Sequence, residues 1–321
     1  MLMRCHNVTV FSVCLMLVGV GTLTAQDYPN KPVRIVTAAP GGSIDFTARL
    51  IAQGLAGALG QQVVVENRVG GVLPGDLVSK APPDGYTLMV HGSGHWLAPY
   101  MQDKVPYDPV RDFAPITQPV SLPHMIVVHP SLPVKSIKDL IALAKARPGA
   151  LNDASTGIGS ATYVAAQLFK SMAGINMVSV AYKGSAPALS ALLSGEVQVM
   201  FAATAAGTPL VKARRLKALA VTSAAPTALA PDLPTVAASG LPGFEATSIY
   251  GMFAPAQTSA HIINRLNHET VRALNRSDTK EKFFNAGADV VAGTPEQLAA
   301  AIKSEMTVLG KVIRDLGIRT E

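Results

Sequence analysis

The sequence predicts an α/β protein with two lobes, because strands and helices alternate in two separate groups. The first group ends at about residue 121, and the second runs from about residue 125 to residue 223. The segment "FAPITQPVSLP" joins the groups and looks like a crossover. After "PGFEATSIYGMFAP" the sequence predicts only helices, which must return to the first group to cover a sheet. We therefore expect mostly parallel sheets and two crossovers.

These crossovers define the expected lobes. Residues 26–120 and 250–321 are expected to form lobe 1, and residues 121–249 to form lobe 2. Ligands of open α/β sheets bind at the carboxyl ends of the strands. The two lobes are therefore expected to share one cleft, as in a hinged binding protein.

The first group begins with a strand at Val33–Ala38 and a helix at Ser43–Leu59. Apolar residues recur in this helix at intervals of three or four, which is typical of an amphipathic helix. Short apolar strands follow at Val63–Val65 and Thr87–Val90, and "APPDGYT" before the second of these strands predicts a turn.

The second group contains a strand at Met125–Val128 and a helix that Ser136 caps and Pro148 ends. A helix is expected from about Ser160 to Ala173, and a short helix separates two of the later strands. The remaining strands are expected at Leu151–Ala154, Val178–Tyr182, Val197–Phe201 and Leu216–Val221.

The last predicted helix has a complete start signal. Thr294 stands at the N-cap, Pro295 at the first helical position, and Gln297 closes a capping box.

Residues 1–25 have the pattern of a cleavable secretory signal peptide. Arg4 precedes the apolar run "VTVFSVCLMLVGVGTL", and "LTA" ending at Ala25 is a cleavage site. A transmembrane anchor is the alternative, but the run is shorter than the roughly 20 residues that a span needs. The two cysteines, Cys5 and Cys14, both lie in this segment. Disulfides, thiol catalysis and cysteine-based zinc sites are thereby excluded from the rest of the chain.

The net charge of +6 comes from scattered basic residues. A nucleic-acid surface would need clustered basic residues interleaved with aromatic ones, and aromatic residues make up only 5% of the chain. The charge therefore indicates a weak general attraction for anions.

Two glycine-rich turns each precede a predicted helix. "PGGSID" places Gly41 and Gly42 before Ser43 and Asp45, and "STGIGSAT" places Gly157 and Gly159 before a helix with Ser160 and Thr162 in its first turn. The first N–H groups of a helix lack intrahelical partners, and glycine lets an anion approach them. Each turn alone is explained as a tight turn with a cap. The presence of one such turn in each lobe predicts that the two turns together clamp a carboxylate.

Other polar residues give weaker signals. His91 and His95 in "HGSGHW" have a metal-like spacing, but Gly92 and Gly94 argue against a helix, so we expect a cleft loop there. Trp96 either forms one wall for a flat ligand or packs in the core. Lys183 either pairs with a carboxylate or is solvated. The chain after the leader has no serine-hydrolase elbow, Walker motif or zinc-protease motif.

Several segments lie in the order typical of one known family, among them "PVRIVTAAPGGSIDFTARLIAQGL", "KAPPDGYTL", "HPSLPVKSIKDLIALAKARPGALN" and "VAYKGSAPALSALLSGEVQVMF". Nearly all of the chain after the leader resembles the Bug-type substrate-binding receptors of tripartite tricarboxylate transporters. The resemblance implies a periplasmic "Venus flytrap" that delivers a small carboxylate to a membrane permease. It also implies that the loop Pro40–Asp45 and the helix start Gly157–Thr162 bind carboxylate through N–H groups, hydroxyls and water.

Two departures from the family pattern bear on the ligand. Tyr163 and Gln167 stand where family members often have His and Glu, and "FAATAAG" lacks the acid that often follows the preceding strand. An ammonium group would lack a counter-ion there, so we expect a plain or aromatic carboxylate, with an aromatic dicarboxylate favoured.

The sequence thus predicts a monomeric solute-binding protein without catalytic activity, metal or cofactor. An exported two-domain hydrolase and an orphan receptor that feeds a sensor protein remain alternatives. The residues expected at the ligand are Gly41, Gly42, Ser43, Ile44, Asp45, Ser93, His95, Trp96, Thr156, Gly157, Gly159, Ser160, Ala161, Thr162, Tyr163, Lys183, Ala203 and Thr204.

Overall fold

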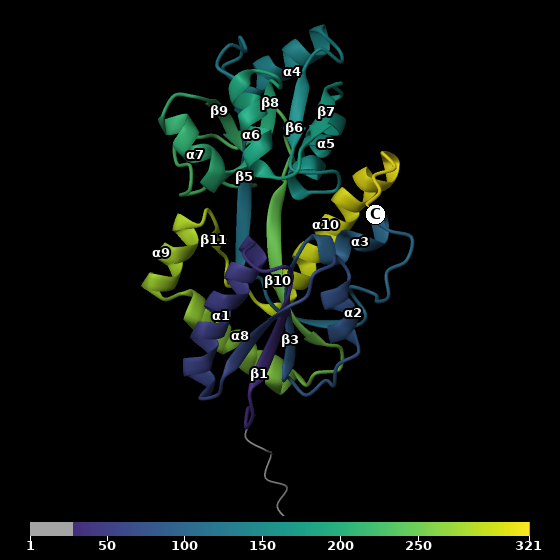
Figure 1. Cartoon of the computed structure of the whole chain (residues 1–321), viewed down its shortest axis with the longest axis vertical. Helices are drawn as coiled ribbons and strands as arrows, with labels where there is room; N and C mark the ends of the chain where they lie inside the picture. The colour runs from purple at the N-terminus through teal and green to yellow at the C-terminus, as the bar shows by residue number, and fades with distance from the viewer. Residues whose placement is uncertain (1–27, 321) are drawn as a thin grey trace, which may run out of the picture.

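The computed structural model describes residues 28–320 and has two lobes joined by two long strands (Figure 1). Strand β5 (Val120–Val128) carries the chain from the lower lobe to the upper one, and β10 (Thr247–Pro255) carries it back. The two strands pair with each other antiparallel, with Ile249 opposite Ser121. The α/β class and the two crossovers are confirmed. The residue limits of the lobes remain a prediction, and the predicted signal peptide lies outside the described residues.

The lower lobe is built on a sheet in which β1 is parallel to both β2 and β3, while β10 is antiparallel to β3 and β4. Its strands are β1 (Val33–Thr37), β2 (Val63–Asn67), β3 (Thr87–Gly92) and β4 (Phe113–Thr117). Its helices are α1 (Ser43–Leu59), α2 (Leu73–Ser79), α3 (Gly94–Met101) and α8 (Ala260–Leu274). Helices α1 and α8 lie in close contact, because a Cβ atom on Gly54 would stand 2.5 Å from the Cβ of Ala273.

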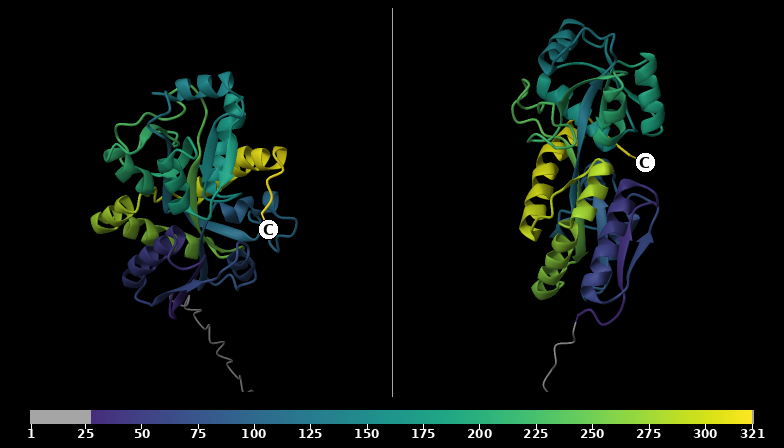
Figure 2. Two further views of the ribbon diagram at one scale, coloured as in Figure 1. Left: turned by 45° about the horizontal axis from the view of Figure 1, so that its top comes forward. Right: turned by 90° about the vertical axis from the view of Figure 1, so that its left-hand side faces the viewer.

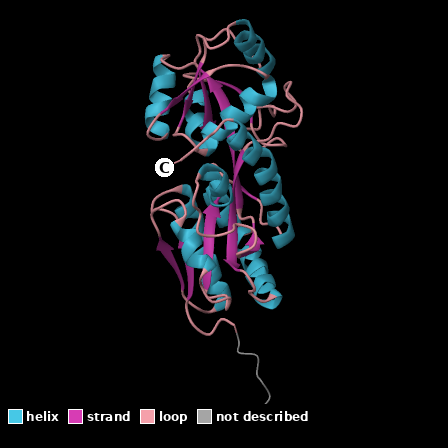
Figure 3. Ribbon diagram, turned by 90° about the vertical axis from the view of Figure 1, so that its right-hand side faces the viewer, coloured by secondary structure: helices cyan, strands magenta, loops and turns pink. Residues whose placement is uncertain are grey.

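The upper lobe is built on a second set of strands. Strand β6 is parallel to β7 and β8, and β5 is antiparallel to β8 and β9. The strands are β6 (Asn152–Ser155), β7 (Val178–Ala181), β8 (Val199–Ala203) and β9 (Lys217–Val221). The helices are α4 (Ile137–Ala146), α5 (Ala161–Ala173), α6 (Ser185–Ser194) and α7 (Thr204–Lys212). Helices flank the strands in both lobes (Figure 3).

Three further elements complete the described chain. Helix α9 (Ser277–Asn285) leads to the two-residue strand β11 (Asp289–Val290), which pairs with β5. Helix α10 (Pro295–Asp315) follows. None of the described helices has the length and apolar character that a membrane crossing requires.

The sheets are mixed, which corrects the expectation of mostly parallel strands. The residues after Glu245 were expected to give only a crossover and helices, yet they form the long strand β10. A strand that returns the chain to the lower lobe must run opposite to β5, and it also runs opposite to β3. The two antiparallel strands are therefore a consequence of crossing twice between the lobes.

The predicted helix starts agree with the structure. The Ser136 hydroxyl accepts a hydrogen bond from the Asp139 N–H, and Thr294 forms the capping box with Gln297. Helix α1 has the predicted bounds, and Gly60 at its end adopts the left-handed conformation that glycine favours.

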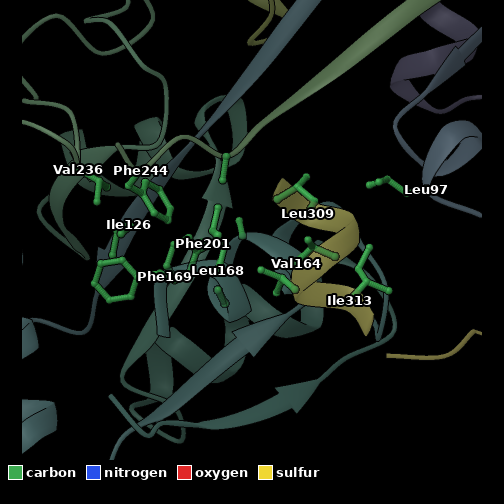
Figure 4. Packing of buried hydrophobic residues seen from close by; sticks show 14 of the residues in the cluster. Leu97, Ile126, Val164, Leu168, Phe169, Phe201, Val236, Phe244, Leu309 and Ile313 are labelled. Carbon is green, nitrogen blue, oxygen red and sulfur yellow. The ribbon is translucent and has the colours of Figure 1, made fainter. Parts of the chain in front are cut away.

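Helix α10 contacts both lobes. It packs against α3 in the lower lobe and against α5 in the upper lobe, and Figure 2 shows it (yellow) reaching from one lobe to the other. Its side chains Leu309 and Ile313 lie near Val164 of α5 in the same buried cluster (Figure 4). The main apolar core therefore continues from one lobe into the other along α10.

Candidate functional site

A cavity of about 230 Å³ lies where the two lobes meet. The lower lobe contributes Ile44 from α1 and Ser93 next to α3, and the upper lobe contributes Gly159 and Ala161 at the start of α5. The crossing strand β10, His124 in the middle of β5 and Leu309 of α10 contribute to the wall as well. Both predicted glycine-rich turns thus lead into helices that border one cavity.

The turn before α1 is held by a buried carboxylate. Asp45 accepts hydrogen bonds from the Gly41 N–H at 2.9 Å, from the Asn67 amide at 2.8 Å and from the Arg49 guanidinium at 3.0 Å. Burial alone would raise the pKa of Asp45, but these hydrogen bonds outweigh burial and hold it below its usual range. Both carboxylate oxygens of Asp45 are thus occupied, so its role is to shape the turn. The contact of Asp45 with a ligand stays a prediction.

Ser43 connects this turn to the crossing strand. Its Oγ lies 2.5 Å from the phenol oxygen of Tyr250, which lines the cavity. Gly41 has φ +81° and Gly42 is extended at the N-cap, and both residues are exposed. The first N–H groups of α1 therefore belong to an open turn whose side chains are already fixed.

The turn before α5 is held by hydroxyl groups. The Thr162 Oγ1 accepts a hydrogen bond from the Thr156 N–H at 3.2 Å and lies 3.1 Å from Ser160 Oγ. Ser160 Oγ also accepts from the Tyr163 N–H at 3.3 Å. Gly157 and Gly159 both have positive φ. These hydroxyls are used within the turn, and the residues of the turn that line the cavity are Gly159 and Ala161.

The last described residues contact this second turn. A Cβ atom on Gly159 would stand 2.4 Å from Cγ2 of Thr320 and 3.3 Å from the sulfur of Met101. The Thr320 N–H donates to the Met101 carbonyl at 3.1 Å, and Met101 also lines the cavity. Thr320 therefore bridges two cavity-lining residues, one from each lobe.

"HGSGHW" does not form the predicted loop. Helix α3 begins at Gly94, so His95 and Trp96 lie on a helix and are almost fully buried. The His95 ring stacks on Tyr107 with centroids 4.6 Å apart, and burial lowers its pKa well below the usual value. Neither His95 nor Trp96 lines the cavity, whereas Ser93 does.

Trp96 packs in the core, which is one of the two alternatives that the sequence left open. Its side chain is 0% exposed, and its ring centroid lies 6.1 Å from that of Phe253. The indole N–H donates to a carboxylate oxygen of Glu305 at 2.8 Å. Burial raises the pKa of Glu305 to about 7, although this hydrogen bond opposes the shift. The preference for an aromatic ligand loses the support of Trp96.

Other predicted contacts also lie outside the cavity wall. Lys183 is exposed between β7 and α6. Thr204 is buried and donates to the Gly287 carbonyl at 3.2 Å, and Ala203 precedes it at the end of β8. Gln167, which the sequence singled out only as a departure from the family pattern, donates to Ser179 at 2.9 Å, beside the buried ion pair of Lys170 with Asp153. The structure thus gives these side chains structural positions or solvent.

The sequence did not single out several cavity residues as ligand contacts. His91, His124 and Tyr250 supply polar groups to the wall, and Leu97, Met101, Val164 and Leu309 supply apolar ones. His124 had a detectable signal, since it is a polar residue in the apolar segment "VSLPHMIVV". The predicted strand began one residue after it, so it was passed over.

None of the described residues that line the cavity is a lysine, an arginine, an aspartate or a glutamate. Among the described hydrogen bonds, none joins a lining hydroxyl to His91 or His124, so no serine-histidine pair is assembled. The part of the chain from 28 to 320 contains no group of three His, Cys, Asp or Glu residues placed to hold a metal ion. The cavity is therefore suited to hold a small molecule with an apolar body.

Residues 47–318 match the sequence profile of the tripartite tricarboxylate transporter family receptor. A curated relative, "UPF0065 protein in tcbD-tcbE intergenic region" of Pseudomonas sp. (strain P51), is 37% identical over 290 residues, which are 89% of this chain and 86% of that protein. The expected family resemblance is thus confirmed.

Two solved structures are similar over most of their length. "R. palustris Rpa4515 with adipate" has a TM-score of 0.73 and 33% identity, covering 91% of this chain and 99% of the other. "MatC (Rpa3494) from Rhodopseudomonas palustris with bound malate" has a TM-score of 0.71 and 31% identity, covering 89% of this chain and 100% of the other.

Proposed function

This chain belongs to the tripartite tricarboxylate transporter receptor family, and on that premise we propose that its cavity captures a small carboxylate for delivery to a membrane permease. The observation that carries the proposal is the position of the cavity between the starts of α1 and α5. Helix N-termini present unpaired N–H groups and partial positive charge, which stabilise an anion.

The wall of the cavity favours a ligand with an apolar body. Ile44, Leu97, Val164 and Leu309 surround the space, and acidic side chains are missing from the described lining. An ammonium group buried there would have no counter-ion, which is costly. Many ligand pockets measure roughly 300–1,000 Å³, so 230 Å³ suits a small acid. Adipate and malate, carried by the two similar structures, are of the appropriate class.

The mechanism we propose is closure of the lobes around the ligand. A ligand that touches both helix starts only in the closed form shifts the hinge equilibrium toward that form. The permease would then recognise the closed receptor. We further propose that the mature protein is a periplasmic monomer without enzymatic activity, exported by the signal peptide at residues 1–25.

A thermal-shift screen of the mature protein tests the proposal. We expect at least one of malate, adipate, phthalate, benzoate and citrate to raise the melting temperature in a saturable manner. X-ray scattering at saturation is expected to give a smaller radius of gyration than without that acid. Absence of any stabilisation across the screen would refute carboxylate capture, and an unchanged scattering profile with a bound acid would refute closure.

A further inference from the structure

The cavity contains two buried imidazoles that the proposed function does not use. His91 lies at the end of β3 and His124 on β5, and both are less than a tenth exposed, at 7% and 5%. Among the described side chains that line the cavity, these two imidazoles can gain a positive charge by taking up a proton. A buried anion that lacks a lysine or arginine partner makes such a proton favourable.

The surroundings of His124 hold it neutral in the empty cavity. Its Nδ1 lies 3.3 Å from the Ala246 carbonyl, which requires Nδ1 to carry the hydrogen and leaves a lone pair on Nε2. Burial lowers the pKa of the ring, against a smaller opposite effect of this hydrogen bond. The neutral ring is therefore ready to accept a proton when a negative charge arrives.

None of the described residues that line the cavity carries a fixed charge that competes for this imidazole. From α5 the cavity receives Val164 and Ala165, from α10 it receives Leu309, and from the residue just before β10 it receives Ala246. The backbone N–H of His124 is hydrogen-bonded to the Thr222 hydroxyl at 2.9 Å. Tyr250 and His91 are the other titratable residues of the described lining.

His91 is the other imidazole of the described lining. Its ring lies 5.9 Å from that of His95. Its Nδ1 lies 3.3 Å from the carbonyl of Gly92, and burial lowers its pKa, as it does for His124. His124 lies on β5, which crosses between the lobes, whereas His91 lies on β3 in the lower lobe. Glu305 of α10 accepts a hydrogen bond from Trp96 and is absent from the described cavity wall.

We propose that a carboxylate enters this cavity together with one proton, which His124 takes up at Nε2. His124 and the start of α5, which contributes Gly159 and Ala161, border the same space. The imidazolium would add the positive charge that the main-chain N–H groups supply only in part. This inference rests on the proposed function, because it assumes that the cavity binds an anion.

The direction in which affinity changes with pH follows from the expected rise of the His124 pKa on binding. Binding raises the pKa of His124, so the complex holds more protons than the free receptor between the two pKa values. Affinity should then rise as pH falls. A neighbouring carboxylate moves a pKa by about 1–3 units, so we expect about tenfold weaker binding at pH 8.0 than at pH 6.5. Malate, adipate, benzoate and phthalate are ionised throughout this range, because carboxyl groups of this kind titrate well below pH 6.5.

Calorimetry of the mature protein tests the proposal. The ligand is adipate, or whichever of malate, benzoate and phthalate gives the largest thermal shift. Titrations at one pH in bis-tris and in Tris differ in apparent enthalpy by the protons exchanged. We expect uptake of about half a proton to one proton near pH 7. His124→Gln should abolish the uptake and flatten the pH profile, whereas the exposed control His268→Gln should keep both. His91→Gln alters the cavity wall, so its affinity can change, but the proton uptake should persist.

The outcomes separate the two proposals. Tight binding without proton uptake in the unmodified protein overturns the role of His124 and leaves carboxylate capture standing. Loss of uptake in His91→Gln but not in His124→Gln also overturns it. If no acid binds at any pH, the proposed function itself fails. Should His124→Gln unfold, NMR titration of the histidine rings replaces it, and a His124 pKa that does not rise with bound acid overturns the proposal.

Discussion

The glycine-rich turn before α1 is held by charged side chains, whereas the turn before α5 is held by hydroxyl groups and by the segment that follows α10. Asp45 gathers three donors in the first turn, and Thr162 with Ser160 and Thr156 forms the second. The comparison shows that two helix starts can border the same cavity although charged side chains hold one turn and hydroxyl groups hold the other. The side chains that the sequence placed at the ligand are largely those supports.

The largest contrast between the turns is expected at their left-handed glycines. Both substitutions carry the cost of a side chain at positive φ, about 1–2 kcal/mol. Only Gly159→Ala also displaces Thr320, because a Cβ on Gly41 meets no atom within 4 Å. We expect Gly159→Ala to weaken binding of the acid found in the screen by about tenfold and Gly41→Ala to weaken it less. Isothermal calorimetry measures both.

Thr320→Ser provides a matched rescue, because it removes Cγ2 and keeps the hydroxyl that accepts from Gln102. Adding Thr320→Ser to Gly159→Ala should restore part of the affinity. Equal losses in the two glycine variants, with no rescue, would show that the contact with Thr320 is unimportant.

The next contrast is in the response to pH. Asp45→Asn removes the carboxylate that accepts hydrogen bonds from Gly41, Arg49 and Asn67. We therefore expect a loss of about 1.5–3 kcal/mol in the free energy of unfolding near pH 6. The pKa of Asp45 lies below its usual range. Its contribution is therefore present above the unfolded pKa of about 3.9 and lost as pH falls through the folded pKa.

Thr162→Val is the control in the other turn. It should cost about 1 kcal/mol at pH 6 and the same at pH 3, because no titrating group is removed. Urea unfolding at both pH values measures the differences. A loss in Asp45→Asn that stays constant between pH 6 and pH 3 would contradict the ionic support of the first turn.

The smallest contrast concerns two serines. Ser43→Ala breaks the hydrogen bond to Tyr250, a cavity residue, so we expect about threefold weaker binding. Ser160→Ala removes an N-cap, so we expect a stability loss of about 1 kcal/mol with little change in affinity. Calorimetry measures the affinity of both variants, and thermal unfolding measures their stability. An affinity loss in Ser160→Ala but not in Ser43→Ala would show that the second turn makes the polar contacts.

Local signals predicted much of the fold. Helix α1 has polar and apolar faces, a glycine turn before it and Gly60 after it, and its bounds were predicted correctly. The capping box at Thr294 gave the start of α10. Which elements meet across the lobes depends on contacts between distant residues, and these leave no local pattern.

The errors at the site have the same origin. Helix α3 buries His95, Trp96 and Leu97 in succession, so it lacks the polar face that would reveal a helix, and Gly92 and Gly94 suggested a loop. Trp96 was left open between core and ligand wall, and only its packing against Phe253 decides for the core. His124 became a site residue through the return of β10, which brings Ala246 against its ring.

The contact of Thr320 with Gly159 has a practical use as an optical sensor. Thr320 is partly exposed, yet its backbone is anchored to Met101 and its methyl group packs on the turn that borders the cavity. Residues 28–320 contain no cysteine, so Thr320→Cys in a protein of these residues would accept a single environment-sensitive dye. Such a dye would report the filling of the cavity as a change in brightness, without any label inside the binding space.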